Sequence, residues 1–249
     1  MMERVIQLIE KEKSKLQECH FLSWLSNSDI PVDEKMSFTP SMLFFIMGFK
    51  DLLSCMSIQK PKNEVERHIS SHCLEDIEHW KWYIEDLNQL GYSKIGSNLI
   101  SFASLVWSED TKESRELIYK AFNYHYTKPS VLIDLILIEI MEATFGAFSE
   151  SLKSCYEKRP EIYTLKFFGE THQTAEKNHT SGNWLEHGEI NKDILTIDLS
   201  EEERLFATEM TIDLFSAFGK MFEMWFEQKA NMINFRSKPF DYCSGRLFC

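Results

Sequence analysis

A nearly continuous apolar run, Val131-Leu-Ile-Asp-Leu-Ile-Leu-Ile-Glu-Ile-Met-Glu-Ala-Thr-Phe-Gly-Ala-Phe148, lies just past the middle of the chain. It has the length of a helix and is apolar on nearly every side, which predicts a central helix that other helices surround. Glu139 and Glu142 interrupt it one turn apart, so at least one carboxylate is expected to point inward. A buried carboxylate must be protonated, paired or bound to a metal ion. Because basic residues are scarce nearby, a metal role for Glu142 is favoured over a structural salt bridge.

The rest of the chain also predicts helices. The 249 residues include only 9 glycines and 6 prolines, and apolar residues recur mostly at steps of three and four. The expected helices cover residues 3–26, 39–57, 61–90, 94–107, 111–126, 130–158, 160–179 and 200–234. Gly91 supplies a C-terminal stop, and Ser200-x-x-Glu203 is a capping box. The pattern predicts one all-α domain over residues 1–249, a bundle of seven or eight helices.

The composition argues against several classes of protein. The formal net charge of −12 argues against nucleic-acid binding, because phosphate neutralisation needs clustered Lys and Arg. The N-terminal stretch lacks the apolar core of a signal peptide, and the longest apolar run, residues 42–49, is too short to span a bilayer. Six cysteines are scattered without a Cys-x2-Cys pair. We therefore expect a cytoplasmic protein with reduced thiols that does not bind a membrane.

The strongest functional signal is Glu170-Thr-His-Gln-Thr-Ala-Glu-Lys-Asn-His179. On a helix, steps of four and then three residues bring His172, Glu176 and His179 to one side. Two imidazoles and a carboxylate form a ligand set that suits iron, manganese or zinc. One histidine at such a place is usually a satisfied core residue, but three polar groups in register favour a metal site.

The helix expected over residues 160–179 would also place Leu165 and Phe168 on this face. The three polar residues would then continue an apolar stripe, which predicts that they face the interior of the bundle.

A second cluster lies about a hundred residues earlier, in His72-x2-Glu75-Asp76-x2-His79. It again places imidazoles and carboxylates at helical spacing, on the border of an apolar stripe. An ordinary amphipathic helix with polar shoulders explains this segment equally well, because charged pairs at such spacing are common on helix surfaces. Taken together with Glu142, the two clusters provide enough donors for two metal ions.

The order of these motifs resembles that of the haem-oxygenase-like dimetal oxidases, the family that includes the chlamydial protein associating with death domains. In that family a ligand pair on one helix precedes a bridging Glu on a central helix, and a His-x3-Asp-x2-His motif follows about thirty residues later. Here His79, Glu142 and His172 occur in that order, and Glu142 precedes His172 by thirty residues. Glu176 replaces the usual Asp. The helix around His79 also looks like the family's first ligand helix.

The first carboxylate of the family pattern has several candidates here. Family members place it seven or three residues before the ligand that corresponds to His79. These positions are His72 and Asp76 in this chain, and Glu75 lies four residues before His79. We favour Asp76, with His72 as an alternative or additional ligand.

The resemblance implies a haem-oxygenase-like bundle that holds two Fe(II) ions per chain, with Mn as a possible replacement. Glu142 would bridge the ions, Asp76 and His79 would serve one of them, and His172, Glu176 and His179 would complete the pair. The implied function is O2-dependent oxidation of a small organic substrate, by N-oxygenation, desaturation or oxidative C–C cleavage of an amino-acid-like or fatty-acid-like compound. A homodimer is expected by analogy with other proteins of the fold.

Three alternatives use the same helical fold. Thiamin-degrading and cofactor-free oxidising enzymes need no metal, and they leave the donor constellation unexplained. Haem oxygenase would need a proximal histidine on the first helix, where His20 lies, but it would not need Glu142 or the later histidines. A non-catalytic interaction protein could keep the fold with a structural metal or with none.

Overall fold

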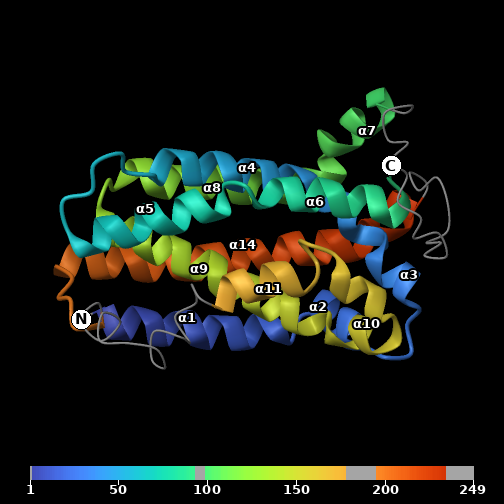
Figure 1. Ribbon diagram of the computed structural model, residues 1–249. Helices are drawn as coiled ribbons and strands as arrows, with labels where there is room; N and C mark the ends of the chain where they lie inside the picture. The colour runs from blue at the N-terminus through green and yellow to red at the C-terminus, as the bar shows by residue number, and fades with distance from the viewer. Residues whose placement is uncertain (1, 93–98, 178–194, 234–249) are drawn as a thin grey trace.

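Long helices run side by side along one axis of the molecule (Figure 1). The computed structural model describes residues 2–92, 99–177 and 195–233, and no strand occurs within these ranges. The elements of the bundle are α1 (Met2–Gln17), α4 (Leu43–Met56), α5 (Glu64–Asp76), α6 (His79–Leu87), α8 (Lys112–Thr127), α9 (Val131–Ser151) and α14 (Glu201–Ile233). The predicted all-α fold is thus confirmed.

Helix α9 is the central helix that its apolar sequence predicts. Every residue from Ile133 to Thr144 is buried, so no face of this part of the helix meets solvent. It packs against α1, α14, α5 and α2 (His20–Ser26). Both Glu139 and Glu142 lie within this buried stretch. The sequence predicted that at least one of these two side chains points inward, and the bundle buries both.

Several expected helices are divided into shorter ones. The remaining elements are α3 (Val32–Lys35), η1 (Met36–Met42), η2 (Asn88–Tyr92), α7 (Leu99–Val106), η4 (Glu109–Thr111), α10 (Lys153–Lys158), η5 (Pro160–Thr164) and α11 (Glu170–Lys177). The helix expected over 3–26 is α1 followed by α2, and the one expected over 130–158 is α9 followed by α10. The helix expected over 39–57 begins with the end of the 3₁₀ segment η1, which contains Pro40, and continues as α4. At the other end of the chain, the Ser200–Glu203 capping box forms as predicted and begins α14.

The helix expected over residues 61–90 consists of α5 and α6 with a break at Ile77 and Glu78. Asp76 is the last residue of α5, and His79 is the first residue of α6. The turn that ends this segment contains Gly91 at φ 91, a backbone conformation that residues with a Cβ rarely adopt. The break therefore lies between two candidate ligands.

The prediction of one continuous helix over residues 160–179 is wrong. After η5 the chain is extended at Leu165, and α11 starts only at Glu170. Gly169 occupies a tight turn, because a Cβ there would lie 2.3 Å from the carbonyl oxygens of Leu165 and Tyr163. Leu165 and Phe168 are buried, but they do not share a helix face with His172.

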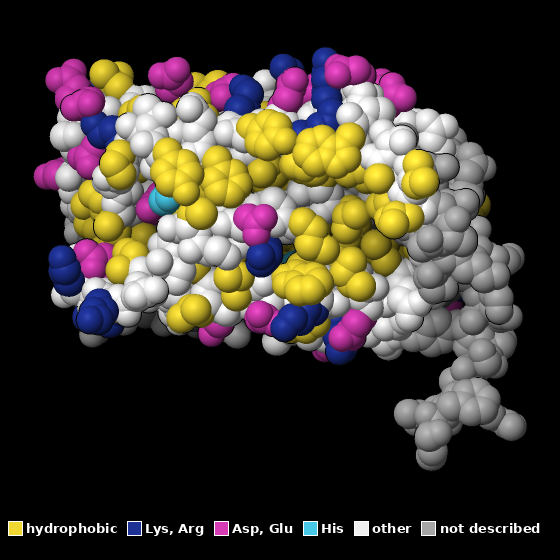
Figure 2. Space-filling view, turned by 90° about the horizontal axis from the view of Figure 1, so that it is seen from above, with side chains coloured by type: hydrophobic (Ala, Val, Ile, Leu, Met, Phe, Trp, Pro, Cys, Tyr) yellow, Lys and Arg dark blue, Asp and Glu magenta, His cyan; other side chains and the backbone are white. Residues whose placement is uncertain are grey.

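By length and composition alone, the stretch Val32–Met56 could cross a membrane. In the structure it comprises α3, η1 and α4, which pack against α14 and α8. Figure 2 shows the molecule from above, the side along which α4 lies in Figure 1, with apolar side chains gathered along its middle and charged ones mostly toward its edges. Core helices of globular bundles pass the same composition test, so the stretch is weak evidence for a membrane span.

Candidate metal centre

His72, Asp76 and Glu142 form a compact buried cluster between α5 and α9. The Nε2 atom of His72 lies 2.8 Å from Oδ2 of Asp76 and 3.3 Å from Oε1 of Glu142. One donor atom from each residue lies within 4.8 Å of the other two. Helical spacing explains the first pair, since His72 and Asp76 are one turn apart on α5. Packing of α5 on α9 supplies the third member.

The two acids of this cluster act on the imidazole of His72. Burial alone would lower the pKa of the His72 imidazole, but hydrogen bonds and Coulomb attraction from Asp76 and Glu142 outweigh it and raise that pKa well above 6.5. The two acids therefore favour the charged form of the His72 imidazole. A divalent cation would take the place of the imidazolium proton, as at other sites where metal binding releases protons.

His79 and His172 extend the cluster toward α11. Nδ1 of His79 lies 3.6 Å from Oδ1 of Asp76, and the two imidazole rings are 4.6 Å apart between centroids. Nδ1 of His172 donates to the carbonyl oxygen of Phe167 at 3.0 Å, which makes Nε2 the ring nitrogen that can bind a metal ion. Metal-binding histidines commonly have this arrangement, because the second hydrogen bond fixes the tautomer and the ring plane.

Aromatic rings hold these two imidazoles in place. Trp82 stacks on His79 with 4.3 Å between ring centroids, and Phe145 and Phe167 lie 4.1 and 4.5 Å from His172. All five candidate donors of the described chain are buried, and they come from α5, α6, α9 and α11.

Asp86 anchors the segment that leads into α11. Its carboxylate is fully buried and accepts the backbone N–H groups of Lys166, Phe167 and Phe168 at 2.9, 2.7 and 3.0 Å. Burial raises the pKa of Asp86 to about 6, although the three N–H groups act in the opposite direction. Asp86 lies seven residues after His79, on the same side of α6. The N–H of Phe167 donates to Asp86 and its carbonyl oxygen accepts from His172, so the backbone of Phe167 connects α6 to the histidine of α11.

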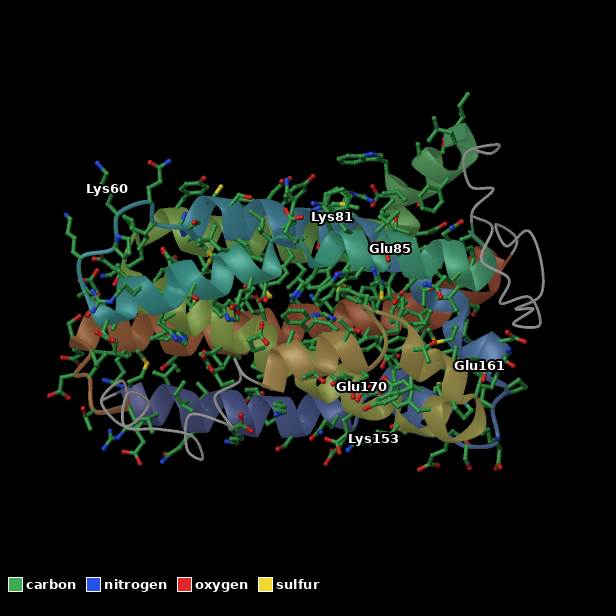
Figure 3. The ribbon with its side chains drawn as sticks, viewed as in Figure 1. Lys60, Lys81, Glu85, Lys153, Glu161 and Glu170 are labelled. Atoms are coloured by element: carbon green, nitrogen blue, oxygen red, sulfur yellow. The ribbon has the colours of Figure 1, made fainter. Side chains whose placement is uncertain are left out.

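The adjacent surface pair strengthens this connection. Glu85 Oε2 lies 2.6 Å from Lys166 Nζ at the outer edge of the same contact. In the side-chain view, the labelled Glu85 lies on α6 and Glu170 on α11 (Figure 3).

Some predicted ligands lie elsewhere or outside the described residues. Glu75 is exposed on α5, which removes it from the set of first-carboxylate candidates. The backbone of Glu176 belongs to α11, but its side chain lies outside the described part of the chain, and so does His179 altogether.

The described donors fit a divalent metal ion by their chemistry and spacing. Imidazole nitrogens and carboxylate oxygens suit iron, manganese and zinc. Neighbouring ligand atoms on one ion with bonds of about 2.1 Å lie roughly 3 Å apart. The distances of 2.8 and 3.3 Å from His72 Nε2 match that separation. His72 fits the set as well as Asp76 does, so both stay candidates.

No protein-family model matches the chain, and a search of curated proteins finds no significant match. Among solved structures, the chain is similar to a TenA homologue from Pseudomonas syringae pv. tomato str. DC3000, with a TM-score of 0.54 and 11% identity over 93% of this chain and 91% of that one. What the two proteins share is the fold. This helical fold is related to that of haem-oxygenase-like proteins, in agreement with the expected fold, and the likeness says nothing of the reaction.

A cavity of about 70 Å³ opens beside the donor set. Asp76, His79, Glu142 and His172 line one part of it, and aromatic and methionine side chains line most of the rest. Two further residues were not predicted from the sequence: Asp86, which anchors the segment before α11, and Lys50, which lines the cavity. The signal for Asp86 was its seven-residue spacing from His79, and the signal for Lys50 was a lone base directly after an apolar run.

Proposed function

We propose that the protein is a metal-dependent oxidase that uses O2 to oxidise a small organic substrate at a site with two divalent ions, Fe(II) in the first instance or Mn(II). The observation that supports this is the convergence of three imidazoles and two carboxylates from four helices in a buried place beside a cavity. Glu176 and His179 would complete the set. Iron held by such donors supplies the electrons that reduce O2 and the oxidising power for the substrate.

The residues of the chain have separate roles in this proposal. Asp76 and Glu142 offset the charge of the ions, and His72, His79 and His172 supply nitrogen donors. The hydrogen bond from His172 to Phe167 would fix the tautomer and ring plane in which its other nitrogen binds an ion. The apolar cavity wall keeps bulk water from the reacting groups.

The alternative is a metal-free protein of the same fold, either a thiamin-degrading or cofactor-free enzyme or an interaction protein. The observation in its favour is that Nε2 of His72 lies 2.8 Å from Asp76 and 3.3 Å from Glu142, so these side chains can also pair with one another. A thiolate mechanism at Cys73 has no support, because burial raises the pKa of this thiol to about 12.

Iron loading separates the two functions. The purified protein is loaded with Fe(II) without oxygen, bound iron is counted, and visible absorbance is followed after mixing with O2. We expect about two irons per chain and an absorbance change that depends on O2. Asp76→Asn should abolish both, whereas Glu75→Gln, its exposed neighbour, should change neither. Absence of specific iron uptake by the wild-type protein, or uptake without any reaction with O2, would favour the alternative.

A cytoplasmic location and a homodimeric state belong to the same proposal. The described cysteines are free thiols, as expected in a reducing compartment. O2 and one small molecule are the proposed partners, without nucleic acid or membrane.

A further inference from the structure

Helix α7 has one apolar face that is buried and another that is exposed. Its eight residues, Leu99–Val106, include no charged side chain. Phe102 is buried, whereas Leu99 and Ile100 are 63% and 83% exposed. Figure 1 shows α7 projecting from the side of the bundle on which α4 lies. An uncharged helix with a second, exposed apolar face is typical of a helix that also packs against a partner.

Trp107 continues this face, because it follows α7 and lies two helical turns after Ile100. Its side chain is 61% exposed, but its position is fixed by the buried side chain of Arg115. Arg115 donates to the carbonyl oxygens of Val106 and Ser108, and its guanidinium lies 5.5 Å from the centre of the indole ring. An exposed tryptophan that is already held in place loses little conformational freedom on association, as expected of a residue that contributes strongly to an interface.

Aromatic rings extend this surface onto α4 and α8. The ring of Phe44 lies 5.3 Å from that of Trp107 and 6.0 Å from that of Tyr119 between centroids. Tyr119 is 53% exposed, and Tyr126, two turns later on α8, is 63% exposed. The side of the molecule on which these helices lie is the one viewed in Figure 2, where apolar side chains gather along the middle. The exposed members form what we call the apolar patch: Leu99, Ile100, Trp107, Tyr119 and Tyr126.

The apolar patch is large enough for most of an interface. Its five side chains expose on the order of 500 Å², if a large apolar side chain has roughly 150–250 Å² of surface. A stable interface buries about 800 Å² on each partner. Phe44 and Met47, which are partly exposed on α4, would add to this area. The apolar patch therefore exceeds what scattered surface residues contribute and is comparable with the functional patches of monomeric proteins.

Charge favours a second copy of this chain as the occupant. With a formal net charge of −12, two copies repel each other over most of their surfaces, and an anionic membrane would repel the protein as well. The apolar patch avoids this repulsion, since α7 is uncharged and the exposed residue of α8 between Tyr119 and Tyr126 is Asn123. Glu116, one turn before Tyr119, is an acid at its edge. An uncharged apolar surface is complementary to itself, as a two-fold interface requires.

We propose that two copies of the chain associate through the apolar patch, with Ile100 and Trp107 near the middle of a two-fold interface. The dimeric state rests on the proposed function, and this inference adds the surface that forms the dimer. The candidate metal ligands of the described chain lie outside the apolar patch, so association does not require iron.

Sedimentation analysis of the full chain, without metal and over a range of concentrations, tests this. The wild-type protein should form dimers, and Ile100→Glu should weaken their association by at least about a hundredfold, because the two-fold axis brings two new carboxylates into one apolar interface. Tyr119→Glu, in the part of the apolar patch on α8, should weaken it in the same way. Leu205→Glu is the matched control, since Leu205 is 56% exposed on α14 outside the apolar patch, and it should leave the dimer intact.

Two further measurements on Ile100→Glu keep folding and function apart from association. Its urea unfolding and its iron uptake should match those of the wild-type protein, because the side chain of Ile100 is mostly exposed and lies outside the candidate metal centre. A monomeric Ile100→Glu that unfolds and loads iron normally would support the proposed interface.

The proposed interface and the oxidase can fail separately. A wild-type protein that stays monomeric, or a dimer that both patch variants leave intact, would overturn the interface while iron uptake and O2 reactivity could still hold. Binding of a monomeric protein to neutral phosphatidylcholine vesicles, lost in Ile100→Glu, would also overturn it and assign the apolar patch to a membrane. A dimer that the patch variants dissociate, in a protein that takes up no iron, would support the interface and contradict the oxidase.

Discussion

The two halves of the candidate metal centre are supported in different ways. His72, Asp76 and Glu142 lie on long helices, and helical spacing together with the packing of α5 on α9 brings them together. His172 lies on the short helix α11, after a non-helical segment whose N–H groups are held by the single carboxylate of Asp86. The position of the first half depends on the packing of the bundle, and the position of the second half depends on the hydrogen bonds of Asp86. Donors with the same chemistry therefore differ in how easily they are displaced.

Removal of His72 should have the largest effect on the metal-free protein. His72→Leu leaves Asp76 and Glu142 buried without the cation that lies between them, which should cost about 3–5 kcal/mol of unfolding free energy. Urea unfolding in the presence of a chelator measures this. His68→Leu, one turn earlier on α5 and only partly buried, should cost less than about 1 kcal/mol. Equal losses in the two variants would show that the ion pair contributes little to the first half.

Loss of the Asp86 anchor should affect the second half selectively. Asp86→Ala leaves three backbone N–H groups without their acceptor, which should cost about 2–4 kcal/mol. Hydrogen exchange should become faster at residues 166–172 while the amides of α9 stay protected until global unfolding. Glu85→Gln breaks only the exposed contact with Lys166 and should cost less than about 1 kcal/mol. Uniform acceleration of exchange along the chain would contradict a local anchor.

The direction in which stability changes with pH should show whether burial raises the pKa of Asp86. Its pKa is about 6 in the folded protein, above the value of 3.8 for an ordinary Asp, because burial disfavours the carboxylate. The folded state therefore binds the proton more tightly than the unfolded state, and stability falls as pH rises from about 4 to 6. Between pH 4 and 6, the unfolding free energy of the wild-type protein should therefore fall by about 2–3 kcal/mol more than that of Asp86→Asn.

This pH effect is read as the difference between two urea unfolding series, so that the other titrating groups cancel. A difference that stays constant from pH 4 to 6 would mean that the N–H groups cancel the effect of burial at Asp86, and one of the opposite sign would mean that they outweigh it.

Much of the fold could be predicted from short-range patterns. The apolar stretch around Glu139 and Glu142 predicts a central helix because no polar face remains for solvent. The capping box at Ser200 is equally local, since both partners lie within one turn. The breaks at Glu18–Cys19 and Ile77–Glu78 were not predicted, because the helix propensity of the residues changes little there.

The candidate site was predictable where its members share a helix. His72 and Asp76 are one turn apart, and the burial of both follows from the apolar stripe beside them. The exposure of Glu75 separates it from its neighbour Asp76, a distinction that spacing from His79 did not make.

The sequence by itself determined the all-helical fold, the central buried carboxylates and the donor types, because these depend on periodicity and on the cost of burying charge. Only the tertiary structure decided that α11 begins at Glu170, that Asp86 holds the segment before it, and that Lys50 and Asp76 line one cavity. Those features depend on contacts between residues about eighty positions apart, or on the packing of α4 against α5. Such contacts leave no periodic signal in the chain.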